Sequence, residues 1–94
     1  IDLSESDITN YSDYLGGGFG QITKEALAAI KLIGKTEGIL LDPVHTGKAL
    51  AGLIDLANKG VIEAKSNVIF VHTGGLPTIF SHNKDLGEVI NVDS

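Results

Sequence analysis

Two apolar runs of strand length each end abruptly in a polar, glycine-containing turn, and each turn leads into a helical pattern. The first run ends at the turn over residues 42–47, and the second ends at the turn over residues 72–76. Consecutive apolar residues without alternation suit parallel strands that are covered on both faces, so we expect strands near residues 38–42 and 67–72. Open α/β sheets bind ligands at the carboxyl ends of their strands. Two such turns in one short chain therefore predict two walls of one pocket.

Helical periodicity surrounds the two runs. Apolar residues recur at spacings of three and four over residues 22–34, which predicts an amphipathic helix that ends near Gly34. A second such pattern covers residues 47–58 and stops at Gly60, and a short third helix is expected over residues 76–81. A strand, a helix and a strand make a βαβ unit, whose crossover is nearly always right-handed. The predicted fold class is therefore α/β, with a parallel βαβ core.

The two ends of the chain are less regular. We expect a short strand near residues 1–3, followed by a long loop that contains the glycine cluster at residues 16–20. The polar tail is expected to add one edge strand over residues 89–92.

The composition limits the class of protein. Ninety-four residues make at most one small domain, and a formal net charge of −5 argues against a general nucleic-acid binder, which shows a basic face. The chain has no cysteine, which excludes disulfides, and its three dispersed histidines make a poor metal site. No apolar run approaches the roughly 20 residues of a membrane span. Because the first residue is Ile1 and no leader pattern follows, we expect a soluble piece of a longer chain.

The detailed residues of the two turns resemble one enzyme family. Separate motifs occur in the order and spacing of that family, at residues 19–23, 36–49, 51–53 and 70–77. The chain is similar to the carboxyl-terminal part of D-cysteine desulfhydrases and 1-aminocyclopropane-1-carboxylate deaminases over residues 11–86. These are pyridoxal-phosphate enzymes of fold type II, the tryptophan-synthase-β type. The resemblance implies a three-layer α/β sandwich, of which residues 1–94 form a single partial domain.

The resemblance implies a pyridoxal-phosphate-dependent lyase of amino-acid metabolism. The deaminase branch has an acidic residue at the position of Thr46 and a bulky aliphatic residue at that of Thr73. Threonine at both positions favours the desulfhydrase branch, which converts D-cysteine to pyruvate, sulfide and ammonia by β-elimination. The family's cofactor-holding lysine and phosphate loop lie before this segment, so we expect the chain alone to be inactive and to work with the rest of its own enzyme. The family also implies a homodimer in the cytoplasm or an organelle.

The resemblance assigns roles to five positions. Thr73 matches the position beside the pyridine nitrogen of the cofactor, with Gly74 next to it, and Thr46 matches a position near the same nitrogen. Phe19 and His45 stand where the family has tyrosines that cover the cofactor ring and engage the substrate. Phe19 can stack but cannot donate a proton, whereas His45 can stack and titrate near neutral pH. The expected catalytic residues are Phe19 and His45, and the expected cofactor-binding residues are His45, Thr46, Thr73 and Gly74.

Other readings of the same residues stay open. Thr46 and Thr73 can be helix N-caps, and His45 can be an ordinary polar loop residue. The enzyme can be the deaminase or another amino-acid β-eliminase. The loss of two tyrosines, at Phe19 and His45, favours instead a catalytically silent relative that serves binding or assembly.

Three further residues of the turns carry structural expectations. Asp42 is expected to accept backbone N–H bonds within its own turn. His72 is expected to be structural, with its ring bonded to the backbone. Lys48 lies in the first turn of a helix, where a cation is unfavourable, so it needs a partner such as Asp42 or a backbone carbonyl.

Overall fold

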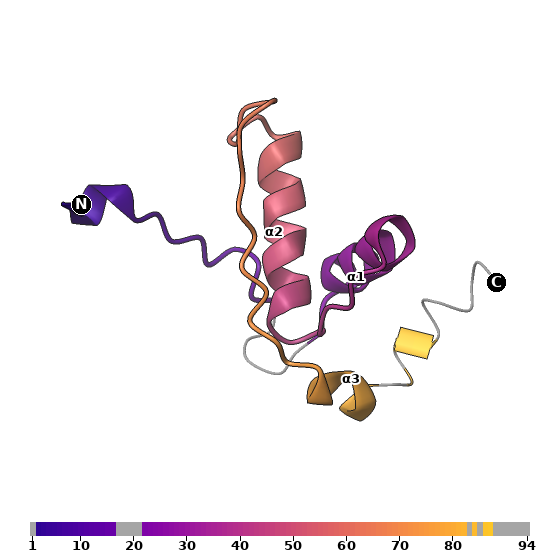
Figure 1. The fold of residues 1–94 in the computed structure, drawn as a ribbon. Helices are drawn as coiled ribbons and strands as arrows, with labels where there is room; N and C mark the ends of the chain where they lie inside the picture. The colour runs from indigo at the N-terminus through magenta and orange to yellow at the C-terminus, as the bar shows by residue number, and fades with distance from the viewer. Residues whose placement is uncertain (1, 17–21, 83, 85, 88–94) are drawn as a thin grey trace.

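The computed structural model describes residues 2–16, 22–82, 84, 86 and 87. Its helices include the 3₁₀ helix η1 (Glu5–Asp7) and the α-helices α1 (Lys24–Glu37), α2 (Thr46–Asn58) and α3 (Pro77–Ser81). Residues 84, 86 and 87 are also helical. Figure 1 shows α1 beside the lower half of α2, and the chain after α2 running back along that helix to α3. None of the helices in the described part of the chain has the length and apolar character that a membrane span requires.

Helix α1 begins and ends at local signals. The Thr23 hydroxyl caps it by accepting the N–H of Ala26 at 3.0 Å. The helix continues through Gly34 and ends at Gly38, which adopts a left-handed conformation with φ 67° and donates its N–H to the Gly34 carbonyl. The predicted end near Gly34 is therefore wrong, because the left-handed position that stops the helix falls four residues later.

The core lies between α1 and α2. Its buried members are Ala29, Ile30, Leu41, Leu50, Ala51 and Leu86. The two helices approach closely at the start of α2, where a Cβ on Gly47 would lie 2.9 Å from Cδ1 of Ile30 and 2.7 Å from the carbonyl oxygen of Asp42. Glycine at this position lets the first turn of α2 pack directly on α1.

The predicted pair of parallel strands does not form within the described residues. Residues 38–42 and 67–72 have no strand assignment and exchange no backbone hydrogen bonds. The two segments are nevertheless neighbours, because Nε2 of His72 lies 2.7 Å from the carbonyl oxygen of Leu40. Ile69 is 90% exposed, so the second apolar run is not covered on both faces. A strand is defined by its backbone partners, and the described chain supplies none to these runs.

The ends of the chain differ from expectation or fall outside the description. Residues 2–4 form no strand and instead lead into η1, whose cap residue Ser4 donates its N–H to Asp7 Oδ2 at 2.9 Å. The predicted edge strand at residues 89–92 and the candidate residue Phe19 lie outside the described residues.

Candidate functional site

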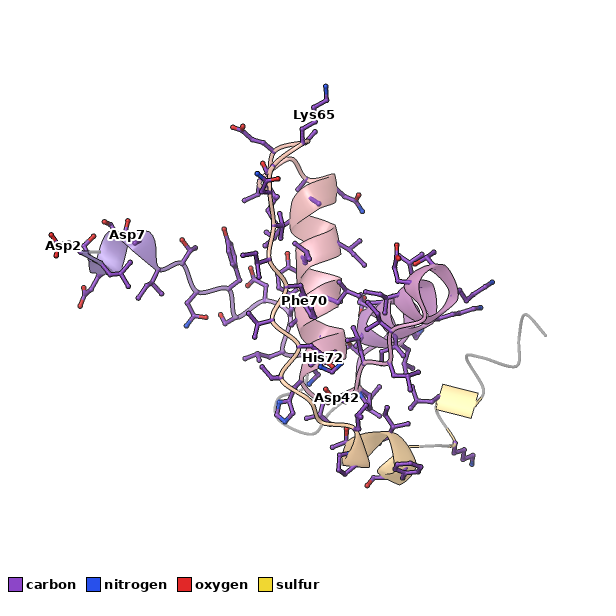
Figure 2. The ribbon with its side chains drawn as sticks, in the orientation of Figure 1. Asp2, Asp7, Asp42, Lys65, Phe70 and His72 are labelled. Atoms are coloured by element: carbon purple, nitrogen blue, oxygen red, sulfur yellow. The ribbon has the colours of Figure 1, made fainter. Side chains whose placement is uncertain are left out.

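The two turns meet at the carboxylate of Asp42. Asp42 is 0% exposed, and a Cβ on Gly75 of the second turn would lie 2.6 Å from its Cγ. The Thr78 hydroxyl donates to the Gly75 carbonyl at 2.7 Å and lies 3.3 Å from Asp42 Oδ2. Figure 2 shows Asp42 and His72 at the same end of α2. The predicted juxtaposition of the two turns is therefore confirmed.

Asp42 also organises its own turn. Its Oδ2 accepts the N–H groups of Val44 and His45 at 2.9 and 2.8 Å, and its Oδ1 accepts that of Thr46 at 2.9 Å. Burial raises the pKa of Asp42, but these hydrogen bonds and that of the Thr46 hydroxyl outweigh it and set the pKa at about 2. The prediction that Asp42 accepts backbone N–H bonds is confirmed.

Thr46 is tied to Asp42 through its side chain. It is 1% exposed, and its hydroxyl donates to Asp42 Oδ1 at 2.6 Å while accepting the Asp42 N–H at 2.8 Å. The only proton of the hydroxyl is thus used within the turn, and one lone pair remains. Helix α2 begins at Thr46 itself with His45 as its N-cap residue, so the N-cap alternative for Thr46 is wrong.

The amino terminus of α2 is not open to an anion. The N–H groups of His45 and Thr46 point to the Asp42 carboxylate, and that of Gly47 donates to the Asp42 carbonyl at 2.7 Å. Free N–H groups at a helix start commonly hold phosphates. Here these three are occupied, so a cofactor phosphate would have to be held elsewhere.

The second turn presents an exposed hydroxyl. Thr73 is exposed, and its hydroxyl has no hydrogen-bond partner among the described residues. Helix α3 starts at Pro77 with Leu76 as its N-cap residue, so Thr73 does not cap it. Gly74, with φ 94°, donates its N–H to Nδ1 of His72 at 3.0 Å.

His72 has the structural role that was predicted. Because Nδ1 accepts the Gly74 N–H, the ring proton is on Nε2, which donates to the Leu40 carbonyl at 2.7 Å. Both ring nitrogens are therefore bonded to backbone groups. The ring holds the second turn against the end of the first apolar run.

A largely apolar groove of about 460 Å³ runs along α2 from the first turn. Its polar lining includes His45, Lys48, Tyr11 and Tyr14, whereas Thr46, Thr73 and Gly74 do not line it. The structure thus places His45 in the groove and the two threonines outside it. Lys48 is 6% exposed.

The Lys48 ammonium group has a backbone partner. Its Nζ donates to the Leu15 carbonyl at 2.9 Å. This bond attaches the amino-terminal segment to the first turn of α2, and a backbone carbonyl of another segment therefore offsets the unfavourable position of the cation.

Sequence reasoning missed the role of Tyr14. Its hydroxyl donates to Asp55 Oδ2 at 2.6 Å, and Asp55 also pairs with Lys59 at 2.8 Å. The hydrogen bond to Asp55 raises the pKa of Tyr14, and that from Lys59 lowers the pKa of Asp55.

The ring of Tyr14 packs over Gly52, where a Cβ would lie 3.1 Å from Cδ2 of Tyr14. In the sequence, the one signal of this close approach between Tyr14 and α2 was Gly52, a glycine inside an apolar helix.

Comparison with known proteins identifies the family. Residues 2–74 match the sequence profile described as "Pyridoxal-phosphate dependent enzyme". The match covers most of the chain, so the chain belongs to this family of pyridoxal-phosphate enzymes. The expected family and cofactor are confirmed.

Individual relatives carry two different names. A D-cysteine desulfhydrase from Klebsiella pneumoniae (strain 342) is 46% identical over 83 residues, which are 88% of this chain and 25% of that protein. A protein from Pyrococcus abyssi, provisionally named a 1-aminocyclopropane-1-carboxylate deaminase, is 50% identical over 78 residues, which are 83% of this chain and 23% of that protein. The chain thus spans about a quarter of the length of these relatives.

A solved structure supports the fold. The crystal structure described as that of "the ACC deaminase homologue" is 44% identical, has a TM-score of 0.67, and matches 77% of this chain and 22% of its own. The expected relation to a fold-type-II enzyme is therefore confirmed.

The described residues fit one side of a pyridoxal-phosphate site. Thr73 offers a hydroxyl without a described partner, and His45 offers an exposed ring at the groove, next to a turn that Asp42 holds rigidly. The start of α2 offers no phosphate cradle, because its first amides are occupied. The described part of the chain also contains no group of three histidine or acidic side chains placed to hold a metal ion.

Proposed function

We propose that this chain is part of a pyridoxal-phosphate-dependent lyase that acts on D-cysteine and releases pyruvate, sulfide and ammonia. The observation that carries the proposal is the exposed Thr73 hydroxyl beside a turn fixed by Asp42, in a chain 46% identical to a D-cysteine desulfhydrase. Pyridoxal phosphate, when bound, supplies the electron sink that such eliminations require. The residues described above hold and orient it on one side.

Thr73 is the proposed partner of the pyridine nitrogen. Its hydroxyl can donate to a neutral nitrogen, because no described group uses its proton. Thr46 cannot donate in this way, because its proton is bonded to Asp42. Thr46 is therefore proposed to contribute a lone pair only, and Gly74 to let the second turn approach the ring without a side chain.

His45 and Phe19 are proposed to contact the ring face and the substrate. His45 lines the groove with an exposed side chain, and an imidazole can stack on a ring and exchange a proton with a substrate. Phe19 is assigned to the ring face from its place in the sequence alone.

Cyclopropane amino-acid deamination is the second candidate. It is favoured by the name of the Pyrococcus abyssi relative and by the solved ACC deaminase homologue. The two threonines distinguish the candidates, since an acidic side chain at residue 46 would offer a charge where Thr46 offers a neutral hydroxyl. A catalytically silent protein that serves binding or assembly is the alternative that lies outside enzymes.

The test uses the full-length protein that contains this chain, loaded with pyridoxal phosphate. D-Cysteine and 1-aminocyclopropane-1-carboxylate are supplied separately, and sulfide and ammonia are measured. Sulfide and ammonia from D-cysteine, without ammonia from the cyclopropane substrate, are expected. Ammonia from the cyclopropane substrate alone would establish the deaminase, and no product from either substrate would favour the silent relative.

Thr73→Ala tests the cofactor contact in the same protein. The loss of one hydrogen bond of roughly 0.5–1.5 kcal/mol should weaken pyridoxal-phosphate binding several-fold and lower D-cysteine turnover, with no change in thermal stability of the cofactor-free protein. Unchanged affinity and turnover would remove Thr73 from the site.

The proposed enzyme is a homodimer of the cytoplasm or an organelle. Size-exclusion chromatography with light scattering of the full-length protein measures the subunit number, and a monomer would contradict the dimer.

A further inference from the structure

The carboxylate of Asp42 contacts both turns at once, although neither contact was part of the expected cofactor site. It accepts three N–H groups and one hydroxyl from the first turn. On its other side lie Gly75, which leaves no room for a Cβ, and the hydroxyl of Thr78. Thr78 links the same two regions, because its hydroxyl also donates to the Gly75 carbonyl at 2.7 Å.

We propose that Asp42 is a positioning residue of the cofactor site, which sets the first turn with His45 and Thr46 against the second turn with Thr73. This inference rests on the proposed function. Its physical basis is the shared carboxylate: a shift of either turn would break hydrogen bonds to a buried charge, which costs more than breaking neutral ones.

The Asp42 carboxylate also fixes the orientation of the Thr46 hydroxyl. Oδ1 takes the Thr46 proton at 2.6 Å, and the Asp42 N–H occupies one lone pair at 2.8 Å. Thr46 can therefore only accept a hydrogen bond from a ligand. Asp42 in this way acts on the cofactor through Thr46, without touching it.

Asp42→Asn is the most direct test, made in the full-length protein. Asparagine has the same shape as aspartate. Its NH₂ group, however, donates hydrogen bonds and cannot accept them, so one of the two oxygens that accept N–H and O–H groups is lost. Asp55→Asn is the matched control, because Asp55 is a hydrogen-bonded carboxylate on helix α2, outside the two turns. Thr78→Val removes the hydroxyl that links Asp42 and Gly75 and leaves the first turn intact.

The first measurement is equilibrium binding of pyridoxal phosphate. The dissociation constant should rise by about tenfold or more for Asp42→Asn, since bonds to a charged group are lost. It should rise by about threefold for Thr78→Val and stay within about twofold for Asp55→Asn. The second measurement is the visible circular dichroism of the bound cofactor at saturation, which reports its orientation and should change in Asp42→Asn but not in Asp55→Asn.

The third measurement needs no cofactor. Amide hydrogen exchange in the cofactor-free protein should accelerate at Val44, His45 and Thr46 in Asp42→Asn. In Thr78→Val these amides should stay protected, because their acceptor is still present.

Each outcome is decisive. If Asp42→Asn loses thermal stability but keeps the parent affinity and dichroism, Asp42 is only structural and the inference is overturned. If Asp42→Asn does not fold, Thr78→Val decides in its place, and an unchanged dissociation constant there overturns the inference. If the unmodified protein itself does not bind pyridoxal phosphate, the proposed function fails instead. Failure of the proposed function is thereby distinguished from failure of the inference about Asp42.

Discussion

The imidazole of His72 joins two segments that are 32 residues apart, with its Nε2 2.7 Å from the carbonyl oxygen of Leu40. The same ring accepts the N–H of Gly74 through Nδ1 at 3.0 Å. One side chain thus fixes the beginning of the second turn on the end of the first apolar run. Thr73 lies between His72 and Gly74 in the sequence, so this bridge also fixes its position.

His72→Phe keeps a ring of similar size and removes both bonds. Each bond is worth roughly 0.5–1.5 kcal/mol, so the free energy of unfolding should fall by about 1–3 kcal/mol. The Gly74 amide should also exchange faster. Denaturant unfolding and hydrogen exchange measure the two effects. The Gly60 amide, bonded to the Ala57 carbonyl at 3.1 Å, is the internal control, and an unchanged Gly74 rate would contradict the bridge.

The helices were predictable because their signals are local. The apolar stripe and the glycine stop predicted a helix over residues 47–58, and α2 runs from Thr46 to Asn58. The end of α1 was misplaced because two glycines compete there. Gly34 is tolerated inside a helix at a cost of roughly 0.5–1 kcal/mol, whereas only Gly38 takes the left-handed conformation that ends it.

Contacts between distant residues were not predictable in the same way. The Asx-type bonds of Asp42 lie within four residues and were expected, but its cover by Gly75 depends on how the chain returns after α2. Tyr14 and Asp55 are 41 residues apart. An apolar run indicates that both faces of an extended segment are buried. Strand pairing, however, depends on backbone partners that the run itself does not specify.

Gly47→Ala should destabilise the protein. The new Cβ would lie 2.7 Å from the Asp42 carbonyl oxygen and 2.9 Å from Cδ1 of Ile30, and overpacking of this kind costs roughly 1–3 kcal/mol. Gly34→Ala is the matched control, since the nearest atom is the Ile39 carbonyl oxygen at 3.9 Å. That helix-interior change should stabilise by roughly 0.5–1 kcal/mol. Denaturant midpoints measure both, and equal effects of the two changes would contradict the close approach.

The phenol of Tyr14 should ionise above its ordinary pKa of 10.0, because its hydrogen bond to Asp55 raises that pKa. A raised pKa means that this bond contributes stability below pH 10 and that the contribution is lost as the phenol ionises at higher pH. Asp55→Asn should bring the pKa of Tyr14 back toward 10.0. The difference between ultraviolet titrations of the protein and of Tyr14→Phe isolates this phenol, and the same difference is measured in the Asp55→Asn background. Two superimposable difference curves would remove Asp55 as the cause.

Acid should lower the free energy of unfolding, because it protonates the Asp42 carboxylate. Its folded-state pKa of about 2 lies below the ordinary value of 3.8, so its contribution is complete above pH 3.8 and is lost as the pH falls toward 2. A displacement of this size corresponds to roughly 2 kcal/mol of unfolding free energy. Urea unfolding across this pH range should show that loss, and Asp42→Asn should lower stability at neutral pH but remove this part of the pH dependence. If the unfolding free energies of the two proteins fall in parallel with pH, the acid sensitivity comes from other carboxylates, and the Asp42 carboxylate does not hold the two turns by its charge.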